Sequence, residues 1–167
     1  MEKIVVVLSG GMDSAVLLYH LLDAGHAVKT LSINYGQRHV RELDSAAALS
    51  DRVGVEHRIA DLSSINPLLG SNSLSSDRTD IPEGHYEEES MKLTVVPNRN
   101  MIMLSVAVGW ALALKFDAVA YGAHSGDHAI YPDCREEFAE ALDQAVRLCD
   151  WHAMKLMRPF VKMDKGE

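Results

Sequence analysis

The segment Leu8-Ser9-Gly10-Gly11-Met12-Asp13-Ser14 constrains the fold of this chain more than any other, because it joins two elements of different kinds. The residues before it, 4–7, are continuously apolar, which is typical of a buried parallel strand, and a helical pattern begins directly after it. Such a turn directs main-chain N–H groups and a helix N-terminus at one point and so predicts an anion site. Gly10 and Gly11 let the backbone approach a phosphate closely.

The side chains of this loop refine the prediction. Ser9 and Ser14 add hydroxyl donors. A carboxylate repels phosphate, so we expect Asp13 either to cap the helix or to hold Mg²⁺. The loop has neither the lysine of a Walker loop nor the spacing of the dinucleotide fingerprint G-x-G-x-x-G. An ordinary glycine-rich turn is the alternative interpretation.

The order of apolar patterns along the chain predicts a doubly wound parallel α/β sheet of the Rossmann-like kind, with right-handed crossovers. We expect Gly25 and Gly54 to end the first two helices. Residues 61–98 lack periodicity and predict a long loop, either functional or disordered. The predicted strands are 3–8, 27–33, 55–60, 117–121 and 155–160, and the predicted helices are 14–24, 40–53, 99–115 and 134–150.

Polar loops follow three of these strands, at 9–13, 34–39 and 122–133. Ligands of doubly wound sheets bind at the carboxyl ends of the strands, so all three loops should open on the same edge. Residues 96–100 and 131–138 add two further polar segments that we expect on the same rim.

The composition excludes several classes of protein. The chain has 167 residues, and its 24 acidic against 16 basic residues give a net charge of −8, which argues against a nucleic-acid partner but not against a small anionic substrate. No apolar stretch is long enough to span a membrane, and a core strand begins too early to leave room for a signal peptide. Cys134 and Cys149 do not form a disulfide framework, and we expect a cytoplasmic protein.

The motifs S-G-G-x-D-S, Tyr35-Gly36-Gln37-Arg38-His39, Val96-Pro97-Asn98-Arg99-Asn100 and Tyr131-Pro132-Asp133-Cys134-Arg135 together resemble a known family. The first resembles the pyrophosphate loop of the PP-loop ATPases, also called N-type ATP pyrophosphatases. All four, in register, resemble the 7-cyano-7-deazaguanine synthase branch, which makes the queuosine precursor preQ0. The likeness runs along the whole chain and implies a single PP-loop domain over residues 1–167.

The resemblance implies an ATP-dependent ligase that joins 7-carboxy-7-deazaguanine and ammonia. ATP first adenylates the carboxylate with loss of pyrophosphate, and ammonia displaces AMP to give the amide. A second adenylation and loss of AMP then give the nitrile. AMP is a far better leaving group than a carboxylate oxygen, so the protein has to hold the α-phosphate in line and neutralise the developing charge. The family also implies Mg²⁺ and a homodimer.

The resemblance assigns expected roles to residues of the rim. Leu8, Gly10, Gly11 and Met12 lie in the phosphate loop with Ser9 and Ser14, and Asp13 holds Mg²⁺. Ser32, Ile33 and Gly122 contact the nucleotide, with adenine read through the backbone of the second strand. The expected catalytic residues are Asp13, Arg38, Arg99, Arg135 and Lys165, and the expected substrate-binding residues are Tyr35, Gln37, Arg99, Tyr131, Asp133 and Arg135.

Several of these residues have simpler interpretations. An arginine in a polar loop is often a solvated charge, and Asp133 is also placed to cap the helix that follows it. Tyr35 and Tyr131 either stack on purine rings or form the edge of the core. Cys134 is interpreted as structural or substrate-lining rather than as a nucleophile, since the sequence fixes no histidine partner.

The chain also departs from the family. The family has a C-terminal segment whose four cysteines bind zinc, and these ligands are absent from this sequence. Ala129 and Ile130 stand where the family usually has small Ser-Gly residues, which predicts a reshaped pocket mouth. Two other functions therefore stay open. One is an adenylating PP-loop enzyme acting on a different base or protein carboxylate, and the other is an inactive nucleotide-binding fragment.

Overall fold

The computed structural model describes residues 1–36, 40–69, 98–122 and 132–160. A five-stranded parallel sheet has the order β3-β2-β1-β4-β5. The strands β2 and β3 are added on one side of β1, and β4 and β5 on its other side, so the order of addition switches between β1 and β4. This is the predicted doubly wound topology. The strands are β1 (Lys3–Val7), β2 (Ala27–Asn34), β3 (His57–Asp61), β4 (Ala118–Ala120) and β5 (Lys155–Met157).

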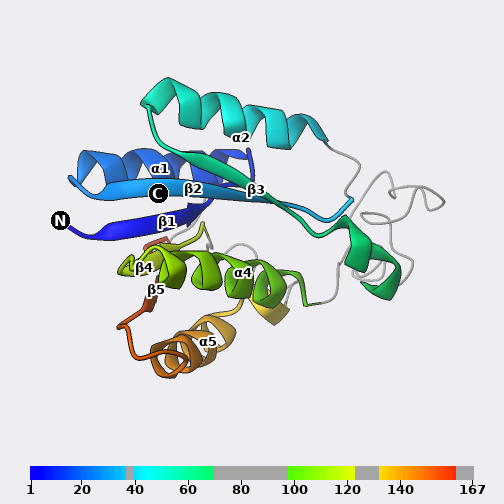
Figure 1. Ribbon diagram of the computed structural model, residues 1–167, viewed down its shortest axis with the longest axis vertical. Coiled ribbons are helices and arrows are strands. Elements are labelled where there is room, and N and C mark those ends of the chain that lie inside the picture. The colour runs from blue at the N-terminus through cyan, green and yellow to red at the C-terminus, as the bar shows by residue number, and fades with distance from the viewer. Residues whose placement is uncertain (37–39, 70–97, 123–131, 161–167) are drawn as a thin grey trace.

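Helices cover both faces of the sheet (Figure 1). One face carries α1 (Met12–Asp23) and α2 (Val40–Val53), and the other carries α4 (Arg99–Ala113) and α5 (Glu136–Leu148). The alternation along β1 explains this arrangement, because Ile4 and Val6 pack with Leu17 of α1 while Val5 and Val7 belong to the cluster beneath α4 and α5. Burial of β1 on both faces accounts for its unbroken apolar sequence.

Two helices end just before the glycines that were predicted to end them. Gly25 follows α1 with φ +87° and Gly54 follows α2 with φ +75°, both in the left-handed region that favours glycine after a helix. The bounds of α2 are those predicted, whereas α1 begins two residues earlier than predicted, at Met12.

The structure corrects other bounds. The predicted strand 3–8 ends at Val7 and the strand 155–160 ends at Met157. Part of the segment predicted as structureless forms the 3₁₀ helix η1 (Ser63–Leu69). The predicted helix 134–150 is shorter, because the 3₁₀ turn η3 (Pro132–Cys134) precedes α5 and Arg135 is the N-cap. Within the described residues, no helix is long and apolar enough to cross a bilayer.

Candidate active site at the carboxyl edge of the sheet

The loop between β1 and α1 forms the first wall of the site. Gly10 adopts φ +87°, and a Cβ on it would lie 2.1 Å from the main-chain oxygen of Glu42 in α2. Any other residue would therefore clash with the backbone of α2 as well as carry the strain of the left-handed region. Glycine at this position fixes how the loop turns into α1.

Hydrogen bonds organise the loop from within. The Ser14 hydroxyl donates to the main-chain oxygen of Gly11 at 3.2 Å and accepts from the Ser9 N–H at 3.1 Å. The Gly11 N–H donates to Ser9 Oγ at 3.3 Å. Among the described residues, the N–H groups of Gly10, Met12 and Ser14 donate to no acceptor. Because these groups lie at the N-terminus of a helix, they are suited to bind an anion.

The first turn of α4 forms the second wall. Its N-cap residue, Asn98, lies in the left-handed region of backbone conformation with φ +62°, and the Asn98 side chain makes no capping hydrogen bond to the helix. The carboxylate of Asp133 caps it instead, because Oδ2 accepts the Asn100 N–H at 2.9 Å. A second helix N-terminus, with its partial positive charge, thus faces the site.

Arg99 is the first residue of α4 and lies half-buried between the cavity and Tyr35. Burial acts to lower the pKa of the Arg99 guanidinium, but its hydrogen bond to Tyr35 and the nearby Cys134 and Asp133 outweigh burial and raise the pKa. Arg99 therefore carries a fixed positive charge, held in place by a tyrosine.

The end of β4 forms the third wall. A Cβ on Gly122 would lie 3.2 to 3.3 Å from main-chain atoms of Asp13 and Ser14, so glycine allows a close approach to the start of α1. The neighbouring Tyr121 is 7% exposed, and burial raises its pKa to about 12. Its hydroxyl therefore stays protonated at neutral pH and can donate a hydrogen bond.

These walls enclose a cavity of about 220 Å³. It contains two helix N-termini, one guanidinium and one carboxylate, which is a composition suited to a phosphorylated ligand. The residues that line it are Val7, Ser9, Gly11, Met12, Asp13, Ser14, Arg99, Asn100, Met103, Tyr121, Gly122 and Cys134.

Asp13 is the carboxylate of this cavity. It lies in the first turn of α1, whose N-cap is Gly11, so the alternative that Asp13 is the N-cap is wrong. One carboxylate beside a phosphate loop fits Mg²⁺, which is commonly held by one or two carboxylates together with substrate phosphates. Within the described part of the chain, no group of three or more metal-ligating side chains occurs, so the residues fit Mg²⁺ shared with a phosphate and do not fit a closed zinc site.

The structure brings together some of the predicted residues and not others. Ser9, Gly11, Met12, Asp13, Ser14, Arg99 and Gly122 line one cavity, although they come from three separate segments. Leu8 is fully buried behind the loop, and Gly10 shapes the turn without lining the cavity.

The second strand does not reach this cavity. Ser32 is 1% exposed and its hydroxyl donates to the Leu8 carbonyl oxygen, which ties β2 to β1. Ile33 and Tyr35 line a small apolar pocket with Arg99. For Tyr35 this placement matches the core-edge interpretation, because its ring packs against the central hydrophobic cluster.

The two predicted site residues in η3 and at the start of α5 lie in different surroundings. Asp133 caps α4, not the helix that follows it, so the simpler interpretation named the wrong helix. Arg135 is the exposed N-cap residue of α5 and is not among the residues that line the cavity. Gln37, Arg38, Tyr131 and Lys165 lie outside the described residues, as do Ala129 and Ile130.

Met103 and Tyr121 belong to the cavity wall but were not predicted, and Asn100 was expected on the rim only as part of the segment 96–100. Tyr121 follows β4 directly, so the rule that ligands bind at the carboxyl ends of strands was sufficient to find it. Nothing in the sequence indicated a separate role for Asn100, because its burial depends on a turn 33 residues further along the chain.

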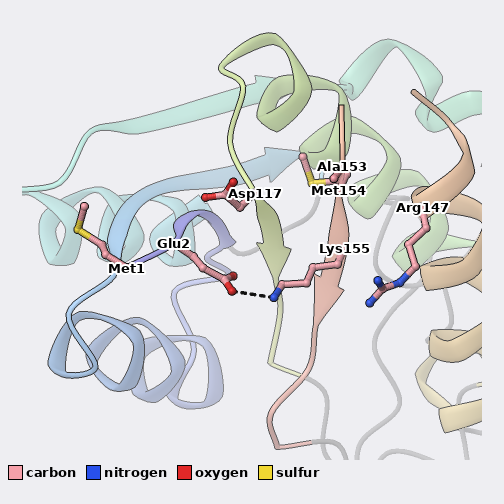
Figure 2. A pocket seen from close by; sticks show the side chains of 7 residues that line it. All are labelled: Met1, Glu2, Asp117, Arg147, Ala153, Met154 and Lys155. Carbon is pink, nitrogen blue, oxygen red and sulfur yellow. Dashed lines mark hydrogen bonds and ion pairs between the residues drawn. The ribbon is translucent and has the colours of Figure 1, made fainter. Parts of the chain in front are cut away.

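A larger cavity of about 360 Å³ lies at the opposite edge of the sheet, where β1, β4 and β5 begin (Figure 2). The charged groups in its wall already have partners. Lys155 Nζ donates to Glu2 Oε1 at 2.8 Å, Asp117 Oδ2 accepts the Lys3 N–H at 2.8 Å, and Arg147 pairs with Asp143. Because these groups are already hydrogen-bonded or ion-paired, and because such sheets bind ligands at the other edge, the carboxyl-edge cavity is the better candidate despite its smaller volume.

Comparison with solved structures supports the fold. A predicted subunit of tRNA methyltransferase from Methanocaldococcus jannaschii matches with a TM-score of 0.61 at 14% identity, over 99% of this chain and 71% of that one. The NMN synthetase of Francisella tularensis matches with a TM-score of 0.54 at 17% identity, over 99% of this chain and 58% of that one. At these identities the likeness concerns the fold alone.

Comparison with protein families and curated proteins is more specific. The model of the family described as "Queuosine biosynthesis protein QueC" matches residues 3–167. Proteins named 7-cyano-7-deazaguanine synthase from Pseudoalteromonas translucida and Alteromonas mediterranea are 53% and 54% identical over 164 residues. Each match covers 98% of this chain and 75% of the relative. The chain therefore belongs to the QueC family of queuosine biosynthesis proteins.

Proposed function

We propose that this protein is an ATP-dependent carbon–nitrogen ligase that converts 7-carboxy-7-deazaguanine and ammonia into 7-cyano-7-deazaguanine. The observation that carries the proposal is the cavity in which the loop from Ser9 to Ser14, the start of α4 with Arg99 and the end of β4 meet. The names of the relatives support the product, 7-cyano-7-deazaguanine.

The chemistry needs two activations. A carboxylate oxygen of the substrate attacks the α-phosphorus of ATP, and pyrophosphate leaves. Ammonia attacks the acyl carbon, AMP leaves and one proton is released. The amide oxygen then attacks the α-phosphorus of a second ATP, and pyrophosphate leaves. Loss of AMP and of the two amide protons gives the nitrile. Each activation concentrates negative charge around the α-phosphate, which fixed positive groups stabilise.

The described residues suit these steps. The N–H groups of Met12 and Ser14, which line the cavity, would donate to the β- and γ-phosphates, and the N–H of Gly10 is assigned the same role through the family likeness. Arg99 is placed to neutralise charge at the α-phosphate or the substrate carboxylate, because a guanidinium pairs with such anions bidentately. Asp13 would hold Mg²⁺, which supplies positive charge to the phosphates when bound.

The remaining roles belong to this proposal through the family likeness. Arg38, Arg135 and Lys165 act on the phosphates or the carboxylate, and Gln37, Tyr131 and Asp133 bind the base. Ser32 and Ile33 bind adenine, outside the described cavity, through the main chain of β2. We further propose a single PP-loop domain over residues 1–167, a cytoplasmic homodimer, and free ammonia as the nitrogen donor.

The test is a product analysis of protein expressed from its complete reading frame. Incubation with 7-carboxy-7-deazaguanine, ammonium, Mg²⁺ and ATP should yield AMP, pyrophosphate and the nitrile, with the amide as an intermediate. Formation of ADP and phosphate in place of AMP and pyrophosphate would contradict the proposal. So would the absence of both nitrile and amide, and pyrophosphate release with a different acid instead would indicate another adenylating enzyme.

A further inference from the structure

Asn100 is a buried polar side chain of the cavity wall, and it is 7% exposed. It joins α4 to the 3₁₀ turn η3 by three contacts. Its N–H donates to Asp133 Oδ2 at 2.9 Å, and its side-chain Nδ2 donates to the main-chain oxygen of Asp133 at 2.9 Å. Nδ2 also lies 3.4 Å from Cys134 Sγ.

These contacts fix the orientation of the Asn100 amide. A main-chain carbonyl oxygen can only accept, so the amide nitrogen has to face Asp133 and the amide oxygen has to face away. Among the described residues, nothing donates a hydrogen bond to Asn100 Oδ1. Oδ1 is not one of the sealed side-chain atoms that lack a partner, and Asn100 lines the cavity, so this oxygen is open to a ligand N–H.

The other polar groups of the wall are mostly donors. The loop N–H groups, the guanidinium of Arg99 and the protonated hydroxyl of Tyr121 all suit the oxygens of phosphate and carboxylate. Ammonia has the opposite requirement. Its lone pair has to point at the acyl carbon, so its N–H bonds need acceptors to orient it.

We propose that Asn100 Oδ1 accepts a hydrogen bond from the ammonia that attacks the adenylated carboxyl group. This inference rests on the proposed function and names a binding residue for its nitrogen donor. A neutral amide oxygen suits the role, because a carboxylate would favour ammonium, which has no lone pair with which to attack. The bond from Nδ2 to Asp133 positions the oxygen.

The test compares Asn100→Leu, which has a similar volume and no polar atoms, with Thr30→Val. Thr30 is fully buried and hydrogen-bonded but does not line the cavity, so its variant controls for lost stability. The rate of nitrile formation is measured against ammonia, ATP and the acid in turn. Asn100→Leu should raise the KM for ammonia at least tenfold and the KM for ATP less than threefold. Thr30→Val should change neither.

Three outcomes separate the possibilities. An unchanged KM for ammonia in folded Asn100→Leu, or an equal rise in all three KM values, would overturn the inference and leave the proposed function intact. A wild-type protein that makes neither amide nor nitrile contradicts the proposed function itself. If far-ultraviolet circular dichroism shows that Asn100→Leu does not fold, the smaller Asn100→Ser is measured, with the same expectation.

Discussion

The carboxylate of Asp133 accepts the main-chain N–H of Asn100 at 2.9 Å, so the helix α4 is capped by a residue 33 positions further along the chain. The bond fixes the turn η3 against the first turn of α4, where Arg99 and Asn100 line the cavity. The geometry of the site therefore depends on this contact between two distant segments.

Replacing Asp133 tests that dependence. Asp133→Ala removes the cap and should lower the free energy of unfolding by about 1 kcal/mol, the usual value of a lost helix cap. Asp133→Asn keeps an acceptor oxygen and should lose less than half as much. Urea unfolding followed by circular dichroism measures both, and equal stability of Asp133→Ala and wild type would show that the cap does not stabilise α4.

Gly10 and Gly25 form a matched pair, because both have φ +87° but only Gly10 lies against another helix. Gly25→Ala should cost about 1 kcal/mol of stability, from backbone strain alone. Gly10→Ala adds a clash with Glu42 and should cost more and weaken ATP binding at least tenfold. Calorimetry with ATP and urea unfolding of both variants test this, and normal ATP affinity in Gly10→Ala would contradict the described loop.

Asp13 is predicted to act in turnover and not in folding. Asp13→Asn should lower kcat by about two orders of magnitude, the usual scale for one lost transition-state contact, with little change in stability. Asp23→Asn, an exposed change at the other end of α1, is the control and should keep wild-type activity. Near-normal turnover of Asp13→Asn would remove this residue from the mechanism.

A buried chain of hydrogen bonds predicts how stability depends on pH. Ser50 Oγ donates to the Ala46 oxygen at 2.9 Å, so the Thr30 hydroxyl is the donor to Ser50 across 2.7 Å. The main-chain oxygen of Glu56, 3.3 Å away, is a second and more distant acceptor for the same proton. The remaining contact, 2.9 Å between Thr30 Oγ1 and His57 Nδ1, then requires the proton to be on Nδ1. His57 Nε2 is buried without a partner, and a second proton there would find no acceptor among the described residues.

Burial accordingly lowers the pKa of His57 from its ordinary value of 6.5. The unfolded chain then binds a proton at a higher pH than the folded chain does, so stability is full above pH 6.5 and falls as the pH drops toward the folded pKa. Urea unfolding at pH 8 and pH 5.5 measures this loss. His57→Asn keeps a donor near Thr30 but does not titrate, so this variant should lose less stability between pH 8 and pH 5.5 than the wild type does. An equal loss in both proteins would assign the effect to other groups.

The sequence predicted what local patterns and strand order determine. The topology was predicted from the unbroken apolar run before Ser9 and from the glycines after α1 and α2. The order of the strands then predicted that the phosphate loop and Gly122 lie at one edge of the sheet. The bounds of α1 and α5 were missed by two residues, because Met12 and the η3 turn are set by the loop and by α4 and not by periodicity.

Contacts between distant segments were not predictable in the same way. Nothing near Ser32 indicates that its hydroxyl is used to join β2 to β1, and nothing near Asp133 indicates that it caps α4. Both depend on the partner that tertiary packing brings to them. Met103, which was not predicted in the cavity wall, lies on α4 and lines the site only because that helix packs across β1 and β4.

The central claim is that the loop from Ser9 to Ser14 holds the triphosphate of ATP. A crystal structure of the protein with Mg²⁺ and an ATP analogue that resists cleavage between the α- and β-phosphates tests it most directly. The account predicts the β- and γ-phosphates within hydrogen-bond distance of the Gly10, Met12 and Ser14 N–H groups, with the α-phosphate toward Arg99. Phosphates bound at the opposite edge, beside Glu2 and Lys155, or elsewhere on the molecule would contradict it.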